Sequence, residues 1–232
     1  ALLLAERPCG ERLSAAMDRL RAARTPQELA EANASVPALA RGLVEGGWRP
    51  EAVSQFLALN ADVVLDTLAR QAIARQGPPP VPFAFLVMGS EGRREQTLCT
   101  DQDNALLFAD PPPEHRERVE EYFRQFGEWV CDGLALAGYA PCEGLVMARN
   151  PERRLSLSGW QECFTQWIRT QEGMDLLQTK IFFDFRCGFG EESLLEPLRE
   201  TLRRELAANP SFFPFLTLDV LEVRPPLALF GG

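Results

Sequence analysis

Clustered metal ligands are scarce in this chain of 232 residues. Histidine occurs once, as His115, and the six cysteines are scattered singly without a CxxC pair. Structural zinc sites and disulfide frameworks need paired or clustered ligands, so the sequence suggests neither. A reduced, cytoplasmic setting fits these cysteines best.

Long hydrophobic runs and excess positive charge are also missing. The longest apolar stretches, such as residues 83–89, are far shorter than the roughly 20 residues that a bilayer-spanning helix needs. Residues 1–5 lack the length and the basic flank of a signal peptide. We therefore expect no membrane segment. The formal net charge of -9 and the pI near 4.8 disfavour nucleic acid as a partner, because a broad phosphate-binding surface requires positive charge.

The first third of the sequence is typical of helices, because its apolar residues recur at steps of three and four. Thr25, Pro26 and Glu28 have the spacing of a capping box, and Pro50 can open a long helix. Gly77 and the three prolines that follow it cannot continue a helix. These signals predict an N-terminal helical domain over residues 1–77.

Beyond the prolines, short β-rich runs alternate with amphipathic helices. The sequence predicts a helix over 114–136, which Gly138 can cap. The runs predicted as strands are residues 83–88, 105–108, 145–148 and 181–185. The fold class is α/β (α+β): an N-terminal helical bundle followed by a mixed sheet flanked by helices over residues 81–208. Residues 209–232 are a Pro-rich apolar tail without a following element, which indicates the start of a truncated C-terminal region.

Residues 83–109 contain a strand, a Gly-Ser turn, a short polar helix and a second strand. Gly89 allows the backbone to approach a ligand closely, and Ser90 is placed to cap the helix that begins near Glu91. Their N–H groups and the serine hydroxyl suit the phosphates of a nucleoside triphosphate (NTP). A Gly-Ser pair alone is more often a simple tight turn. Arg93 and Arg94 are candidate phosphate clamps, or they form surface ion pairs with nearby glutamates.

Two aspartates open the second strand. Asp101 and Asp103 are two residues apart, so their side chains share one face with α-carbons about 7 Å apart. Paired carboxylates suit Mg2+ or Mn2+ bridged to substrate phosphates, although an isolated Asp-x-Asp is more often a solvated turn. Asp184 lies in the apolar run 181–185, where a metal would explain its charge. The alternative for Asp184 is an ion pair with an arginine such as Arg186.

The segments GSEGRREQ, TDQDNALLF and IFFDFRCGFG together resemble the polymerase-beta-type nucleotidyltransferase superfamily. Within it, they are similar to the nucleotidyltransferase domain related to bacterial PII uridylyltransferase, which often accompanies CBS or cyclic-nucleotide-binding domains. The resemblance implies a nucleotidyltransferase-type sheet, an NTP substrate and Mg2+ (or Mn2+). It implies that Gly89 and Ser90 bind phosphates, while Asp101, Asp103 and Asp184 hold metal ions.

The resemblance further implies transfer of a nucleoside monophosphate (NMP) to an acceptor hydroxyl on a signalling protein, with release of pyrophosphate. ATP and UTP are the candidate nucleotides. Gln102 and Asn104 depart from the Ser-Asp-Ile-Asp-Leu strand of the uridylyltransferases, so uridylyl specificity stays open. Two other functions stay open as well: a regulatory module that binds nucleotide without transfer, and an interaction domain whose N-terminal helices dock a partner or a second subunit.

Overall fold

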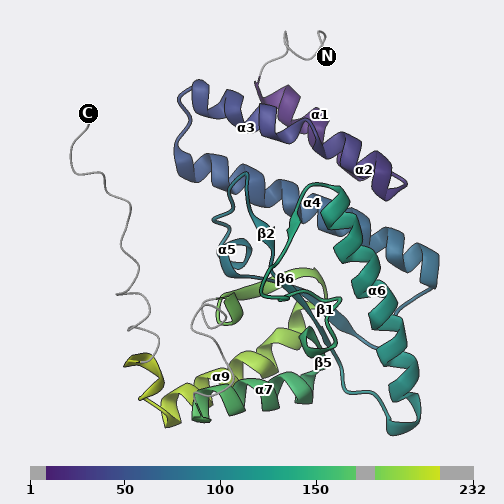
Figure 1. Ribbon diagram of the computed structural model, residues 1–232, viewed down its shortest axis with the longest axis vertical. Coiled ribbons are helices and arrows are strands. Elements are labelled where there is room, and N and C mark those ends of the chain that lie inside the picture. Colours follow the sequence, from purple (N-terminus) through teal and green to yellow (C-terminus); the bar gives the residue numbers. More distant parts are fainter. Residues whose placement is uncertain (1–8, 171–180, 215–232) are drawn as a thin grey trace.

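The computed structural model describes residues 9–170 and 181–214, and Figure 1 shows helices packed around a mixed sheet. The helices are α1 (Cys9–Ala22), α2 (Pro26–Asn33), α3 (Val36–Glu45), α4 (Pro50–Gln76), α5 (Gly89–Gly92), α6 (Arg116–Leu136), α7 (Leu157–Thr170) and α9 (Leu195–Ala208). The strands are β1 (Phe83–Met88), β2 (Asp101–Gln102), β3 (Asn104–Phe108), β4 (Ala140–Pro141), β5 (Arg154–Ser156) and β6 (Phe185–Gly190). The predicted fold class is confirmed.

The N-terminal helices begin and end where local signals place them. The Thr25 hydroxyl accepts a hydrogen bond from the Glu28 N–H (3.1 Å), and the Glu28 carboxylate accepts one from the Arg24 N–H (2.8 Å). The first bond satisfies an N–H group that the first turn of α2 leaves free, and the second holds the residue before the N-cap Thr25. Pro50 opens α4, and Gly77 follows its last residue with a φ of +87°. The helix therefore ends before the proline run, as predicted.

The main sheet has the strand order β5-β3-β1-β6. β1 is antiparallel to both of its neighbours, whereas β3 and β5 are parallel. All six residues of β1 are buried, which explains why it is an unbroken apolar run rather than an alternating one. A second pairing joins β2 to β4 in parallel and lies next to the end of β1. The site is built at that end.

Helices cover both faces of the sheet. Phe83 on β1 contacts the rings of Phe123 and Phe126 on α6, with centroids 5.2 and 5.1 Å apart. α4 packs against α6 and β6. On the other face, Figure 1 shows α7 and α9 side by side, and the indole N–H of Trp160 on α7 donates to the Leu106 carbonyl of β3 (2.8 Å). Trp160, Phe164 and Trp167 are buried, so these aromatic residues belong to the core, as predicted.

α4 is shared between the helical region and the sheet. Its residues Val64, Leu65 and Leu68 lie in the same hydrophobic cluster as β1. By length and composition alone this helix of 27 residues is long and apolar enough to cross a membrane, but 56% of its most apolar window is buried inside the protein. Packing against the sheet and α6 therefore accounts for its apolar composition. The division of the chain into domains 1–77, 81–208 and 209–232 stays a prediction, and residues 215–232 lie outside the described part.

The predicted strand at 145–148 is wrong. Leu145 has a φ of +56° and its side chain is 60% exposed, whereas Val146, Met147 and Ala148 are all buried. The backbone is irregular at Leu145 and Val146 and forms a bend and a turn at Met147 and Ala148, so the segment pairs with no strand of the described chain. Asn104 instead fastens this loop, since its N–H donates to the Val146 carbonyl (3.0 Å) and its side-chain oxygen accepts from the Ala148 N–H (2.8 Å).

The predicted strand at 181–185 is also misplaced, because β6 begins only at Phe185. Ile181 and Phe182 are helical, and Phe183 and Asp184 form a turn and a bend. The rings of Phe182 and Phe183 both contact aromatic side chains of α7. Neighbouring residues of a strand point to opposite faces, so this shared packing requires a turn. Asp184 therefore precedes the strand instead of lying in it.

Candidate active site

Gly89 joins β1 to the site and leaves no room for a side chain. Its φ of +57° is in the left-handed region that favours glycine. A β-carbon there would lie 3.0 Å from Oδ2 of Asp103 and 3.8 Å from the α-carbon of Ile181. The Met88 N–H also donates to the Asp103 carbonyl at 2.8 Å. The turn after β1 is therefore held directly against the second aspartate.

Ser90 lies inside the short helix α5 rather than at its cap. The helix begins at Gly89, so the N-cap position belongs to Met88, which makes no side-chain cap hydrogen bond. The predicted capping role of Ser90 is therefore wrong. The half-buried serine instead anchors the following loop, because its carbonyl accepts from the Glu95 N–H at 2.8 Å.

The sequence of β2 and β3 separates aspartates from amides. Asp101 and Asp103 are turned to the site, while Gln102 and Asn104 are buried and bind main-chain groups. The Gln102 amide donates to two carbonyls of the 131–139 segment at 3.1 and 3.0 Å, and the Asn104 side-chain oxygen accepts from the Ala148 N–H. This alternation follows from the two-residue period of extended backbone. Asp103 lies between β2 and β3, so the amides fix the extended segment 101–104 that presents the carboxylates.

Cys142 joins the two aspartates, which the sequence did not reveal. The parallel pairing of β2 with β4 places Asp101 opposite Ala140, so the chain reaches Cys142 beside the site. Ligand atoms of Asp101, Asp103 and Cys142 all lie within 4.8 Å of one another. Neither the isolated cysteine nor its spacing signals this contact, because it depends on tertiary pairing.

The environment of Asp103 suits a bound cation. Its side chain is only 8% exposed, and Oδ1 is buried without a hydrogen-bond partner among the described residues. Burial raises the pKa of Asp103 to about 6; a hydrogen bond from Cys142 opposes this increase, and the charge of Asp101 adds to it. Burial also raises the pKa of the Cys142 thiol to about 11. Two carboxylates with an unsatisfied oxygen fit Mg2+ or Mn2+, and the sulfur adds affinity for softer ions.

Glu91 is a buried acid in α5, directly after the Gly-Ser turn. Burial raises its pKa to about 8, the charge of Arg186 opposes the increase, and the charges of Asp62 and Asp103 add to it. Arg186 donates to the Glu91 carbonyl (3.2 Å) and to the Asp62 carboxylate (2.7 Å). Arg186 on β6 therefore connects α4 with α5. The polar run around Glu91 gave no sign that this acid would be buried.

Asp184 lies near α5, but its carboxylate is paired with Arg93. Its main-chain carbonyl is so close to Gly92 that a β-carbon there would overlap it. The Arg93 guanidinium contacts Asp184 Oδ2 at 2.6 Å and Glu95 Oε2 at 2.7 Å. Asp184 is absent from the ligand cluster found among the described residues. Its predicted metal role stays a prediction.

Arg93 and Arg94 are neighbours in the chain but have different surroundings. Arg94 has a φ of +59° and lies in a groove with Arg21, Asp62 and Arg186. Both side chains are exposed. The phosphate contacts of Arg93 and Arg94 stay a prediction.

The chain thus has a mixed sheet flanked by helices, with a Gly-Ser turn beside two aspartates. Residues 34–174 match the family described as Putative nucleotidyltransferase DUF294, and the chain belongs to this family. The match includes Gly89, Ser90, Asp101 and Asp103 and ends before Asp184. No curated protein sequence matches the chain.

Proposed function

We propose that the chain transfers an NMP from an NTP to an acceptor hydroxyl and releases pyrophosphate. The observation that carries the proposal is the convergence of Asp101 and Asp103 beside the Gly89 turn. The buried Oδ1 of Asp103, which lacks a partner among the described residues, is a suitable ligand atom for a divalent cation.

Each residue has a distinct role in this proposal. Gly89 and Ser90 present N–H groups and a hydroxyl to the phosphates, while Arg93 and Arg94 neutralise their outer oxygens. Asp101 and Asp103 hold Mg2+ or Mn2+, which neutralises developing phosphate charge when bound. The acceptor oxygen forms a bond to the α-phosphorus as the bond to pyrophosphate breaks. Orientation of these groups is the chain's main contribution.

Asp184 is the proposed third carboxylate. In this role the Asp184 carboxylate lies beside the acceptor hydroxyl and favours loss of the hydroxyl proton. Arg93 must therefore release the carboxylate before transfer. The ion pair of Arg93 with Asp184 supports a second candidate function, a non-catalytic nucleotide-binding regulatory module of a larger signal-transduction protein. In that module the pair is permanent and nucleotide is bound without transfer.

The acceptor belongs to the proposal as well. By the sequence resemblance to PII uridylyltransferase, we propose a hydroxyl on a signalling or regulatory protein in the cytoplasm, with ATP or UTP as donor. The polar environment of the site suits a hydroxyl but selects no base. The acceptor must therefore be found by experiment.

The test uses the four NTPs, each labelled at the α-phosphate, with Mg2+ or Mn2+ and a lysate of the host. The expected result is a labelled protein that requires the chain and one of the metals. Asp103→Asn keeps the size of the side chain but removes its charge, so it should abolish labelling. Gln125→Glu on the exposed side of α6 is a control for a change of charge and should leave labelling intact. If NTP binds with metal but no label is transferred, the regulatory module is favoured.

A further inference from the structure

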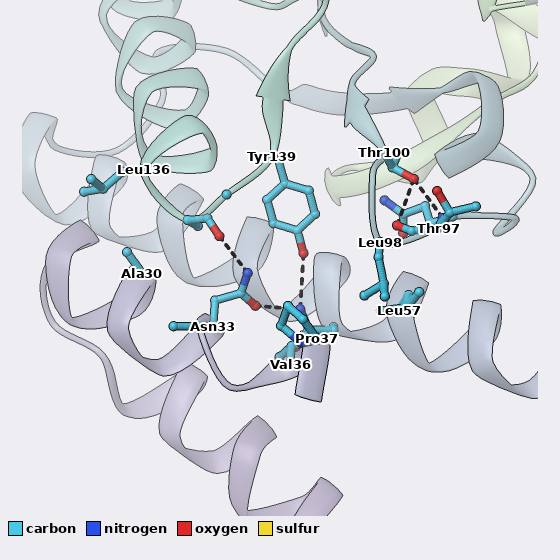
Figure 2. A pocket seen from close by; sticks show the side chains of 15 residues that line it. Ala30, Asn33, Val36, Pro37, Leu57, Thr97, Leu98, Thr100, Leu136 and Tyr139 are labelled. Atoms are coloured by element: carbon cyan, nitrogen blue, oxygen red, sulfur yellow. Dashed lines mark hydrogen bonds between the residues drawn. The ribbon is translucent and has the colours of Figure 1, made fainter. Parts of the chain in front are cut away.

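A second pocket lies behind the loop that leads to Asp101. It measures about 320 Å3, opens to solvent, and is lined by α2, α3 and α4, by the loop 96–100, and by the end of α6 (Figure 2). The loop residue Thr100 immediately precedes Asp101, and Tyr139 immediately precedes β4, which pairs with β2. The pocket is therefore lined by residues directly before β2 and β4, the two strands that bring Asp101 and Cys142 to the candidate active site.

One wall carries a network of side-chain hydrogen bonds (Figure 2). Asn33 donates to the Ala137 carbonyl (2.8 Å), and Asn60 donates to the Asn33 side-chain oxygen (2.7 Å) and to the Tyr139 hydroxyl (3.2 Å). These bonds use the amide N–H groups of Asn60. Its Oδ1 is buried and has no partner among residues 9–170 and 181–214.

Gln96 lines the same pocket, and its side-chain amide lacks more hydrogen-bond partners than that of Asn60. Its side chain is 1% exposed, and neither its amide nitrogen nor its amide oxygen has a hydrogen-bond partner in the described part of the chain. A buried polar group without a partner costs about 1–3 kcal/mol, so native proteins rarely retain one without a use. Gln96 and Asn60 together hold one donor group and two acceptors beside the pocket; each of these atoms has less than 1 Å2 of accessible surface, so a ligand pairs with them after the side chains rotate toward the pocket.

The lining restricts the ligand. Among the described residues that line the pocket none is charged, and the apolar members include Val36, Pro37, Leu57 and Leu98. A triphosphate or a metal ion would find no counter-charge there. A flat, uncharged ring with adjacent donor and acceptor atoms matches both the apolar walls and the amides. Glutamine and asparagine amides pair in this way with the edges of nucleobases.

We propose that this pocket binds a nucleobase, either that of a nucleoside or that of the NTP itself. Gln96 pairs with the hydrogen-bonding edge of the ring, and Asn60 Oδ1 accepts from a further N–H of the ligand. Base binding goes beyond the proposed transfer and requires no catalytic activity. It gives the chain a means of base selection that the Gly-Ser turn lacks.

The test is calorimetric titration of the whole chain with adenosine, guanosine, cytidine and uridine in the absence of metal. At least one nucleoside should bind, and Gln96→Leu should weaken its binding by at least tenfold. The variant should be no less stable than wild type without ligand, because it removes two unpaired polar atoms. Ala30→Phe on α2 provides a second variant, since it fills the pocket and leaves Gln96 in place. Gln125→Leu makes the same chemical change on an exposed surface and should bind like wild type.

Absence of binding by all four nucleosides at millimolar concentration would overturn the proposal. Binding that neither pocket variant weakens would also overturn it, because the nucleoside would then lie elsewhere. Titration in the presence of a nonhydrolysable NTP and Mg2+ distinguishes the two sources of the base. If the NTP competes with the nucleoside, the pocket holds the base of the NTP. If the two bind independently, the pocket holds a separate nucleoside. Since nucleoside binding is measured without transfer, loss of the proposed activity would leave this result standing.

Discussion

Gly89 and Asp103 are in such close contact that a β-carbon at position 89 would lie 3.0 Å from Oδ2 of the aspartate. The positive φ of Gly89 and the hydrogen bond from the Met88 N–H to the Asp103 carbonyl hold the two residues together. The turn after β1 and the Asp103 carboxylate are therefore one rigid unit, and a change in the turn must alter the carboxylate.

Gly89→Ala should weaken Mn2+ binding by tenfold or more and lower the unfolding free energy by about 1–2 kcal/mol, the cost of left-handed backbone for alanine. The loss of affinity follows because the methyl group displaces the Asp103 carboxylate. Gly47→Ala is the matched control, since Gly47 also has a positive φ (+76°) but open space around its β-carbon position. Titration of Mn2+ by electron paramagnetic resonance, with urea unfolding of both variants, measures the two effects. Equal Mn2+ affinity in the two variants would contradict the prediction.

Local sequence patterns predicted the parts of this site that depend on neighbouring residues. β1 and β3 were predicted from their apolar runs, and the pair Asp101 and Asp103 from the two-residue period of a strand. Cys142 was missed, because the pairing of β2 with β4 that brings it close joins segments 39 residues apart, as the register of Asp101 with Ala140 shows. A local pattern carries no information about such a contact.

The errors had a similar origin. The run 145–148 has the composition of a strand, yet tertiary hydrogen bonds from Asn104 hold it as a buried loop. The run 181–185 was interrupted by aromatic packing on α7. In both cases a long-range partner decided the backbone conformation.

Glu91→Gln should flatten the dependence of stability on pH. Burial raises the pKa of Glu91 from an ordinary value of 4.5 to about 8, so the folded state binds the proton more tightly than the unfolded state does. The resulting stabilisation is fully present below pH 4.5 and is lost as the pH rises through 8. The difference in unfolding free energy between wild type and variant should change by at most about 1.4 kcal/mol per pH unit over this range.

Urea unfolding from pH 5 to pH 8 measures this change. Glu45→Gln on the exposed end of α3 is the control for loss of an acid and should keep the wild-type profile. Equal profiles for wild type and the Glu91 variant would show that Glu91 is ionised throughout, and the buried neutral acid would be rejected.

Cys142→Ser should change which metals bind. The thiol lies within 4.8 Å of both carboxylates, and sulfur prefers soft ions while the aspartates supply hard oxygen ligands. The variant should lose at least tenfold in affinity for Cd2+ and change little for Mn2+. Cys163→Ser on α7 controls for loss of a partly buried thiol elsewhere. Calorimetric titration of both ions checks the prediction, and a parallel loss of Cd2+ and Mn2+ affinity would show that Cys142 acts only through packing.

The role of Asp184 distinguishes an active transferase from a module that only binds nucleotide. The Arg93–Asp184 pair is short (2.6 Å), but the two side chains are 40% and 44% exposed, so it contributes at most about 1 kcal/mol to stability. Asp184→Ala should therefore fold normally and bind Mn2+ and NTP through Asp101, Asp103 and the turn. If Asp184 serves the acceptor hydroxyl, single-turnover transfer should nevertheless fall by a hundredfold or more, since only the transition state loses a contact.

Glu95→Ala supplies the control for that experiment, because it removes the other partner of Arg93 and leaves Asp184 in place. It should retain nearly wild-type transfer. Arg93→Ala frees the Asp184 carboxylate, so its transfer should exceed that of Asp184→Ala even if loss of the arginine weakens NTP binding. Wild-type transfer by Asp184→Ala would confine Asp184 to the ion pair and leave Asp101 and Asp103 as the functional carboxylates. The ratio of transfer rate to NTP affinity, measured for all three variants, decides between these roles.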